Sequence, residues 1–430
     1  TTFTDAQRIA LAVSPADPTI VKAIASDNSS GLMGVYGSYN SGATFIPLFV
    51  QNPACENEML GNDLGLPTAS CGGQGWYDLC IAIDPTDPLK VTVGGINTYY
   101  SADGGLSWQI ANVWWNGLPG VAVVHADKHY LAYNPLSGTL YETCDGGIYK
   151  NYGPVTGGWK DISNGIYITQ FYRNAVDNRV SYCLGGAQDN GTKKIDGGVA
   201  TDLRGGDGMQ PLINYADPEF TYYCAYQNGS IDMTSDGGIN YHSITDVLNS
   251  SGAWITPYCL HPADNTTILL GYKNVFLSID NGANWAAISP VFNSNYNINF
   301  MKVSEANPNY IYTVYTDYTV WRSVINYTTN FGATWDTIPV PFTNFISDIV
   351  IDPKNEKRFW VTISGYGGGK VYRYNASPAS WTNESSALPD LPANCMVIDS
   401  SSGTKYLGTD AAIFYKDTTM TSWALFNTNM

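Results

Sequence analysis

A short pattern containing a hydroxyl residue, an aspartate or asparagine, a glycine and an aromatic residue recurs five times along the chain. The copies read SYNSGATF, SADGGLSW, TSDGGINY, SIDNGANW and TTNFGATW, and weaker echoes end at Trp159, Trp381 and Trp423. The aromatic residues of neighbouring copies are mostly about 40 to 60 residues apart, a period typical of repeat architectures. The defining positions of these copies, here called boxes, are Ser38, Asn40, Gly42, Ser101, Asp103, Gly105, Trp108, Asp236, Gly238, Asp280, Gly282, Trp285, Asn330, Gly332 and Trp335.

A second pattern lies upstream of the boxes. Apolar-alternating runs such as DLCIAIDPTDP end in a turn, and a β-rich run such as KVTVGGI follows before the box and one more short strand. This order predicts a four-stranded antiparallel meander per unit, the blade of a β-propeller. We count nine units, which begin near Arg8, Tyr77, His125, Phe171, Asp207, Trp254, Ile298, Ile346 and Asn394.

The predicted fold class is therefore an all-β propeller of four-stranded blades, with eight to ten blades in one ring favoured. Residues 1–430 are predicted to form this single domain, with parts of two smaller propellers as the alternative. Residues 51–75 form a Cys- and Gly-rich insertion, and Cys55 and Cys71 within it are the best local disulfide candidates.

The boxes are predicted to be turns rather than catalytic loops. An Asp or Asn side chain can accept backbone N–H groups within a turn, the glycine adopts a φ that other residues resist, and the aromatic ring packs between sheets. Asn40 and Asn330 replace the acid in two boxes, which a catalytic carboxylate would not tolerate. We therefore assign no catalytic role to the box acids, and we expect Trp108, Trp285 and Trp335 to be largely buried.

The boxes resemble the Asp-box (BNR) repeat of sialidases, sortilin-type receptors and xyloglucan-hydrolase propellers. The segments GQGWYDLCIAIDP, VHADKHYLAYNP, CDGGIYK, ISNGIYITQFY, GGAQDNGT and GGDGM make residues 70–290 similar to secreted Asp-box propellers of Bacteroidetes-type bacteria. Those proteins usually carry a C-terminal type IX secretion sorting domain, so the resemblance implies a secreted, trimmed chain. A sialidase would need an arginine triad and a Tyr–Glu nucleophile pair, and these are not recognisable near the predicted inner strands.

The net charge excludes some classes of binding partner, and the cysteine content indicates the compartment in which the protein works. The formal net charge of −16 argues against nucleic acid and anionic membrane surfaces as partners. No apolar run approaches the roughly 20 residues that span a bilayer. Eight cysteines without a CxxC pair favour an oxidising compartment, so we expect an extracellular protein, either secreted or attached to the cell surface.

His125, Asp127 and His129 form the first cluster that could carry chemistry. On a strand these alternate positions would point to one side, plausibly toward the central channel. Two imidazoles and a carboxylate could hold a divalent metal ion there. The alternative is a hydrogen-bonded polar rim around a water-filled channel, and no other cofactor is predicted.

A second cluster comprises Gln188, Asp189 and Asn190, followed by Asp207. Asp78 and Asp145 occupy comparable points of nearby units, and two such carboxylates could act as acid and base on a glycosidic bond. The alternative is turn chemistry, since QDNG is a strong turn former. Aromatic residues near these acids could stack on sugars or pack between blades: Trp76, Tyr77, Trp114, Trp115, Phe171 and Tyr172.

Three functions remain open. The favoured one is a binding or structural module for glycans, a partner protein or self-assembly, in which His125, Asp127, His129, Asp189 and Asp207 gather near one face of the channel. The second is a glycoside hydrolase on a neutral polysaccharide, with two carboxylates roughly 5 to 10 Å apart across an open cleft. The third is a sortilin-like peptide receptor. Binding is favoured because no acid has a sequence context that demands a raised pKa, and it predicts carboxylates engaged in hydrogen bonds.

Overall fold

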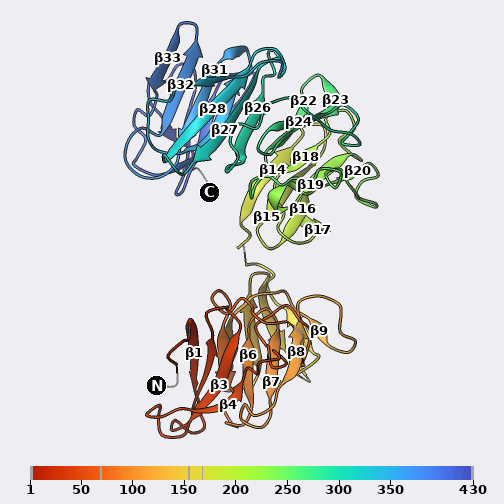
Figure 1. Cartoon of the computed structure of the whole chain (residues 1–430), viewed down its shortest axis with the longest axis vertical. Helices are drawn as coiled ribbons and strands as arrows, with labels where there is room; N and C mark the ends of the chain where they lie inside the picture. The colour runs from red at the N-terminus through yellow and green to blue at the C-terminus, as the bar shows by residue number, and fades with distance from the viewer. Residues whose placement is uncertain (1–2, 68–69, 154, 167, 428–430) are drawn as a thin grey trace. The chain divides into compact units, whose positions relative to one another are not determined.

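The computed structural model describes residues 3–67, 70–153, 155–166 and 168–427, which fold into nine sheets of the β-propeller type, antiparallel except for one parallel strand pair. Eight sheets have four strands in sequence order, and one has five (Figure 1). The chain divides into two compact units, Thr1–Ile168 with three sheets and Thr169–Met430 with six. The sheets are called blades 1 to 9 in chain order.

The first unit contains blades 1 to 3. Blade 1 is formed by β1 (Arg8–Val13), β2 (Val21–Ser26), β3 (Leu32–Ser38) and β4 (Ile46–Val50). Blade 2 is formed by β5 (Cys80–Ile83), β6 (Val91–Gly94), β7 (Thr98–Ser101), β8 (Gln109–Val113) and β9 (Ala122–Val123), the last strand pairing in parallel with β8. Blade 3 is formed by β10 (Lys128–Tyr133), β11 (Leu140–Cys144), β12 (Gly147–Asn151) and β13 (Trp159–Asp161).

The second unit contains blades 4 to 9. Blade 4 is formed by β14 (Phe171–Val176), β15 (Tyr182–Ala187), β16 (Gly191–Asp196) and β17 (Val199–Arg204), and blade 5 by β18 (Pro211–Ile213), β19 (Tyr222–Ala225), β20 (Ile231–Thr234) and β21 (His242–Ser243). A 3-10 turn, η1 (Gln227–Gly229), precedes β20. Blade 6 is formed by β22 (Tyr258–His261), β23 (Asp264–Gly271), β24 (Val275–Ser278) and β25 (Ala286–Ala287), and blade 7 by β26 (Ile298–Val303), β27 (Ile311–Asp317), β28 (Arg322–Thr328) and β29 (Asp336–Ile338). Blade 8 is formed by β30 (Ile346–Asp352), β31 (Asn355–Ile363), β32 (Val371–Ala376) and β33 (Ala379–Asn383), and blade 9 by β34 (Ala393–Ile398), β35 (Lys405–Thr409), β36 (Ile413–Lys416) and β37 (Ala424–Leu425).

The nine predicted units correspond to the nine blades, and the predicted starts lie within a few residues of the first strand of each blade. First strands of successive blades contact one another, as β1 contacts β5, β5 contacts β10 and β26 contacts β30. They are therefore the innermost strands, and the predicted all-β propeller class is confirmed. The organisation of 1–430 as one ring rather than two stays a prediction.

The second strand of most blades forms the core. β2 and β6 are buried along their whole length. Blades 1 and 3 cover the two faces of β6, whereas β2 is covered by blade 2 on one face and by Phe3 and Ala6 of the N-terminal segment on the other. The same sandwiching explains why Ile24, Val93 and Tyr99 pack in one cluster with residues of blades 1 and 2. In such a blade the strand is apolar at successive positions rather than alternating with polar residues.

The boxes form the predicted turns between the third and fourth strands of their blades. In the box of blade 2, Ser101 Oγ donates to Asp103 Oδ1 at 2.8 Å, and the N–H groups of Leu106 and Ser107 donate to the same oxygen at 3.0 Å. Asn330 makes the equivalent contact with the N–H of Thr334 at 2.9 Å. The hydrogen bonds predicted for the box acids are present, and an amide oxygen replaces a carboxylate without loss.

Two of the box tryptophans connect neighbouring blades by a hydrogen bond, whereas the indole of Trp108 bonds Gly105 O of its own box. Trp285 Nε1 donates to Ile244 O at 2.8 Å and Trp335 Nε1 donates to Ile288 O at 2.9 Å, so each indole bonds the blade before its own. Their rings, and that of Trp108, are of intermediate exposure, and each packs against a cluster of buried core residues, in agreement with the expectation of largely buried rings.

The insertion at 51–75 folds against blades 1 and 2. The predicted disulfide joins Cys55 to Cys71, with the two Cα atoms 5.2 Å apart. Met59 and Leu60 are buried in the core shared by these blades, and the buried Glu58 carboxylate accepts the N–H groups of Leu32 and Leu60. The described residues of the insertion, 51–67 and 70–75, are therefore an integral part of the first unit. The other six cysteines are unpaired.

Candidate functional site

Polar side chains from all three blades of the first unit meet where the first strands begin. Arg8 opens β1, a turn containing Tyr77 and Asp78 precedes β5, and Asp127 and His129 flank the start of β10. Asp145 comes from the turn between β11 and β12 of blade 3. We call Tyr77, Asp78, Asp127, His129 and Asp145 the His129 cluster.

His129, Asp145 and Tyr77 form a hydrogen-bonded chain. His129 Nε2 and Asp145 Oδ1 are 2.7 Å apart, and Tyr77 Oη donates to Asp145 Oδ2 at 2.8 Å. The rings of Tyr77 and His129 meet edge to face, with centroids 4.9 Å apart. The hydrogen bond to Asp145 raises the pKa of His129. Burial acts to raise the pKa of Asp145, but the bonds from His129 and Tyr77 outweigh it and lower that pKa.

Arg8 holds the turn that carries the two aromatic residues. Its guanidinium donates to the carbonyl oxygens of Trp76 and Tyr77. Tyr77 is thereby directed toward Asp145, whereas the ring of Trp76 stays 60% exposed beside it, with centroids 5.4 Å apart. An exposed indole next to oriented polar groups is a typical contact surface for a sugar ring.

Asp78 and Asp127 form a carboxyl pair behind this surface. Asp78 is fully buried, and its oxygens meet no donor in ordinary hydrogen-bond geometry. Burial first, and the charge of Asp127 second, raise the pKa of Asp78 to about 9. Asp78 is therefore protonated at neutral pH, and Asp127 is the acceptor that its proton can reach. Gln74 Nε2, from the insertion, donates to Asp127 Oδ1 at 2.9 Å.

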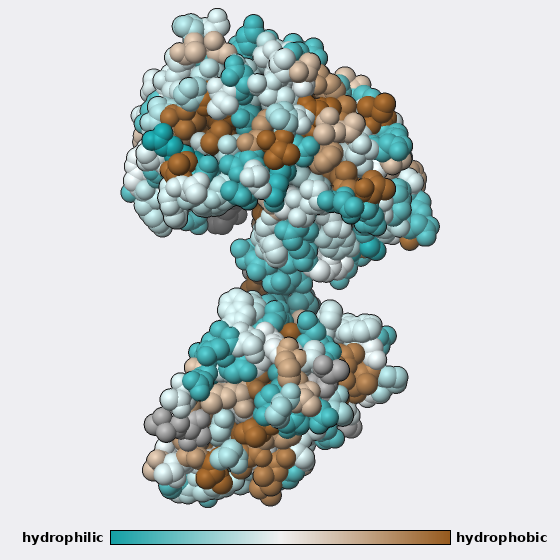
Figure 2. Space-filling model, in the orientation of Figure 1, coloured by the Kyte–Doolittle hydropathy of each residue, from teal (hydrophilic) through white to brown (hydrophobic). Residues whose placement is uncertain are grey.

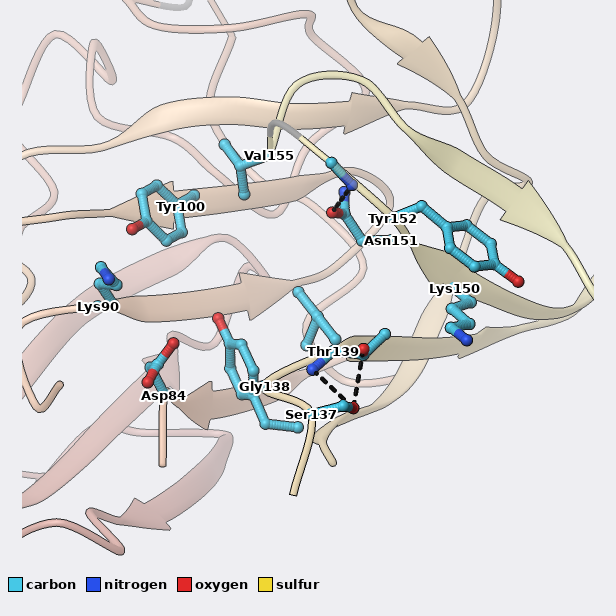
Figure 3. Close-up of a pocket in the computed structure, with 13 residues that line it drawn as sticks. Asp84, Lys90, Tyr100, Ser137, Gly138, Thr139, Lys150, Asn151, Tyr152 and Val155 are labelled. Atoms are coloured by element: carbon cyan, nitrogen blue, oxygen red, sulfur yellow. Dashed lines mark hydrogen bonds between the residues drawn. The ribbon is translucent and has the colours of Figure 1, made fainter. Parts of the chain in front are cut away.

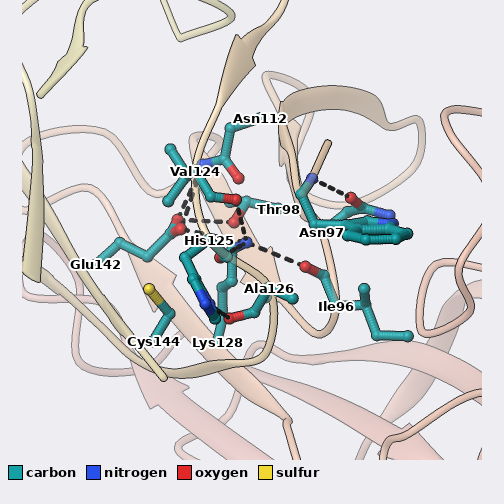
Figure 4. Close-up of polar contacts among 12 residues, drawn as sticks. Ile96, Asn97, Thr98, Asn112, Val124, His125, Ala126, Lys128, Glu142 and Cys144 are labelled. Atoms are coloured by element: carbon teal, nitrogen blue, oxygen red, sulfur yellow. Dashed lines mark hydrogen bonds and ion pairs between the residues drawn. The ribbon is translucent and has the colours of Figure 1, made fainter. Parts of the chain in front are cut away.

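A buried ion pair supports the start of β10 (Figure 4). Lys128 Nζ and Glu142 Oε1 are 3.8 Å apart, and both side chains are inaccessible to solvent. Lys128 also donates to three carbonyl oxygens, those of Ile96, Val124 and His125. Glu142 accepts bonds from two side chains of blade 2, those of Thr98 and Asn112. This ion pair, whose two members are also hydrogen-bonded to neighbouring groups, positions the segment that carries Asp127 and His129.

The argument that placed His125, Asp127 and His129 on one strand face was wrong. β10 begins only at Lys128, and Asp127 has a φ of 66°, so strand alternation does not extend back to His125. Within the described ranges there is no group of three or more His, Cys, Asp or Glu side chains that could hold a metal ion. The structure therefore offers no geometric support for the metal hypothesis. His125 instead packs against Gly146, where an added Cβ would lie 2.3 Å from the imidazole.

The second predicted cluster lies in the second unit, on blades 4 and 5. The N–H of Asp189 donates to Asp207 Oδ1 at 3.0 Å, and Asn190 Nδ2 donates to Gln188 O at 3.1 Å. Asp189 has a φ of 57°, as the turn reading of QDNG predicts. Burial raises the pKa of Tyr172, the hydrogen bond with Trp254 lowers it, and the charges of Asp207 and Asp189 add smaller raising effects. The two predicted clusters thus belong to different units, and their convergence on one channel face stays a prediction.

The remaining predicted aromatics divide between the units. Trp114 and Trp115 form a tilted pair after β8 and are 40% and 50% exposed. Phe171 is 45% exposed at the start of β14. Tyr172 accepts a hydrogen bond from Trp254 Nε1 at 3.2 Å. On the visible face, hydrophobic residues occur as separate small patches among polar ones (Figure 2).

A pocket of about 620 Å³ lies between blades 2 and 3, at the end where their first strands finish. Figure 3 shows Asp84, Lys90 and Tyr100 on one side and Lys150 and Tyr152 on the other. Lys150 Nζ lies 4.4 Å from the ring centre of Tyr152. The sequence offered no signal for this pocket, because its residues are scattered over several turns.

An exposed aromatic group on blades 7 and 8 was also missed. Trp321 and Phe345 stack with centroids 5.8 Å apart, and Tyr318 meets both rings edge to face. Trp321 is 65% exposed and Tyr318 is 51% exposed. The segment DYTVWR resembles an ordinary hairpin, and only its position beside Phe345 makes it an aromatic surface.

Comparisons with known proteins found similar chains among solved structures only. No protein-family model matches this sequence, and no curated protein is similar enough to count as a match. Solved structures that match include a GH74 enzyme of Niastella koreensis, at 14% identity over 99% of this chain and 86% of that chain, with a TM-score of 0.30. The Swd1 β-propeller domain of Myceliophteria thermophila has 9% identity over 65% of this chain and 93% of its own, with a TM-score of 0.45. YCF48 bound to D1 peptide has 10% identity over 80% and 94%, with a TM-score of 0.43. The described residues contain no helix capable of crossing a membrane. At such low identities the matches show what the chain resembles in fold and carry no argument about what it does.

Proposed function

We propose that the protein is an extracellular binding module, secreted or attached to the cell surface, that recognises glycans through the surface formed by Trp76, Tyr77, His129 and Asp145. The observation that carries this proposal is an exposed indole ring with hydrogen-bonded polar side chains held beside it. Trp76 offers a stacking face, and the His129–Asp145–Tyr77 chain offers oriented polar atoms next to it. The disulfide of the insertion supports an oxidising compartment.

The acids of this cluster do not have the arrangement that glycoside hydrolysis needs. Asp145 is hydrogen-bonded to His129 and Tyr77, and Asp127 is hydrogen-bonded to Gln74. Asp78 has the raised pKa of a general acid, but its side chain is fully buried and cannot touch a substrate. Carboxylates tied to neighbouring side chains favour binding over catalysis.

The test is a glycan array with the native protein and the Trp76→Ala variant, followed by titration of the best ligand. Trp76→Ala is expected to weaken binding by about 5- to 150-fold, because an aromatic ring that stacks on a ligand ring contributes about 1–3 kcal/mol. Trp115→Ala removes an equally exposed indole from the same unit and is expected to have no effect.

Two results would contradict the proposal. Loss of binding in Tyr100→Ala but not in Trp76→Ala would place the ligand in the pocket between blades 2 and 3. Robust polysaccharide hydrolysis by the native protein, abolished in Asp189→Asn or Asp207→Asn, would show that the protein is a glycoside hydrolase.

A further inference from the structure

A second pocket, of about 470 Å³, lies between blades 8 and 9 in the second unit. Blade 8 contributes residues of β31 and β32 and the turn after β30, and blade 9 contributes residues of β35, β36 and the adjoining turns. Its charged lining residues are Asp352, Lys354, Arg358, Arg373, Glu384, Lys405, Lys416 and Asp417. The pocket thus holds five of the 21 Lys and Arg residues of a chain whose net charge is −16.

The carboxylates of this pocket are already engaged. Arg358 Nε donates to Asp352 Oδ2 at 2.6 Å, and Arg373 forms an ion pair with Glu384 at 2.8 Å. Asp417 accepts the N–H and the hydroxyl of Thr419, both at 2.7 Å, within a turn. Asp352 and Glu384 are thus paired with arginines, while Asp417 keeps its charge within its turn. Because the lining has five basic and three acidic side chains, positive charge remains in excess.

Lys405 and Lys416 are the unbalanced pair. They are directly opposite each other in the antiparallel pairing of β35 and β36. Like charges at such a position repel and destabilise a sheet. Lys405 Nζ lies 4.8 Å from the ring centre of Trp360, whose indole N–H donates to Glu384 at 2.9 Å. Burial, the first cause, lowers the pKa of Lys405.

We propose that this pocket binds an oxyanion, a carboxylate, sulfate or phosphate group, between Lys405 and Lys416. An anion placed there neutralises the opposed lysines, and lysine ammonium groups are strong donors to anionic oxygens. The cavity has the size of a site for a small molecule, so it can hold the oxyanion on a sugar-sized body. Ser400, Ser402 and Thr418 line the same pocket and offer hydroxyl groups to that body.

The test is calorimetric titration at low ionic strength with sodium sulfate, sodium phosphate, glucuronate and glucose. The three anions are expected to bind saturably and glucose is not. Tighter binding of glucuronate than of sulfate would identify a sugar-borne carboxylate as the source of the oxyanion, and equal binding would identify a free oxyanion.

Two variants remove one charge each from the pair, Lys405→Gln and Lys416→Gln. Both are expected to weaken anion binding at least about tenfold, because each removes one charge-assisted hydrogen bond to the anion. Without ligand, both are expected to melt no lower than the native protein, because the repulsion between the lysines is gone. Lys357→Gln is the matched control, an exposed lysine of β31 outside the pocket.

The proposal is overturned if none of the three anions binds saturably, or if glucose binds as well as glucuronate. It is also overturned if Lys357→Gln weakens binding as much as Lys416→Gln, because general electrostatic attraction would then explain the affinity.

Discussion

Replacing Asp78 by asparagine should change how the stability of the first unit depends on pH. The carboxyl of Asp78 is fully buried and its pKa is raised to about 9, against an ordinary value of 3.8 in the unfolded chain. Between these values the folded state binds one proton more than the unfolded state. The stabilising contribution of this proton is complete below pH 3.8 and is lost progressively as the pH rises toward 9.

The size of the effect follows from proton linkage. Because the folded state binds one proton more than the unfolded state, each rise of one pH unit in this range lowers the free energy of unfolding by about 1.4 kcal/mol. For a unit of this size, 1 kcal/mol corresponds to roughly 2–4 °C in melting temperature, so the native protein should lose about 3–5 °C per pH unit through Asp78. Asparagine has nearly the same shape and can still donate to Asp127, but it does not titrate.

The assay is thermal unfolding, followed by tryptophan fluorescence, at several values between pH 6 and pH 8.5. The melting temperature of Asp78→Asn should exceed that of the native protein by an amount that grows with pH. Asp103→Asn is the control, because hydrogen bonds hold the pKa of this box acid below its usual range against the effect of burial, and asparagine occupies the same position in two other boxes. Parallel curves for Asp78→Asn and the native protein would refute the assignment of a neutral, buried Asp78.

Three further predictions concern other contacts. Glu142→Gln should lower the free energy of unfolding by about 3–5 kcal/mol in denaturant titrations, because it leaves the buried Lys128 ammonium unpaired. Adding Lys128→Met to this variant should recover part of the loss. Equal stability of Glu142→Gln and the native protein would contradict the buried ion pair. Trp285→Phe should cost about 0.5–1.5 kcal/mol by removing the indole bond to the preceding blade, whereas Trp321→Phe, at an exposed indole, should cost less in the same titration. The ion pair of His129 with its carboxylate partner should stabilise the protein fully below pH 6.5 and fade as the pH rises through the raised pKa of the imidazole, a dependence that His129→Gln should lack and that NMR titration of the imidazole can check.

Much of the fold could be predicted because the information is local. A box places its hydroxyl residue, its acid or amide and its glycine within a few residues, so the turn is determined by short-range hydrogen bonds. Asn40 and Asn330 already showed that the acid is structural, and their contacts confirm it. The disulfide between Cys55 and Cys71 was predictable for the same reason, since its residues flank one insertion.

The sequence predicted some residues of the candidate site but not their contacts or their burial. Asp127, His129 and Tyr77 were singled out for their residue types, but their partners are distant in the sequence: His129 bonds another strand connection of its own blade, Tyr77 bonds the next blade, and Asp127 bonds the insertion. Asp78 lies in an ordinary pre-strand segment, and no local pattern shows that burial and Asp127 raise its pKa. No sequence context demanded a raised pKa for any of these acids, and the raised pKa of Asp78 comes from its tertiary environment.

The sequence by itself determined the repeat, the number of blades, the box turns and the local disulfide, because each depends on residues close together in the chain. The tertiary structure decided which charges face each other. The buried pair of Lys128 and Glu142 and the opposed Lys405 and Lys416 depend on strand register and on packing between segments that the chain pattern leaves unspecified. Electrostatic energies depend on distance and burial in three dimensions, and neither quantity is readable from a one-dimensional pattern.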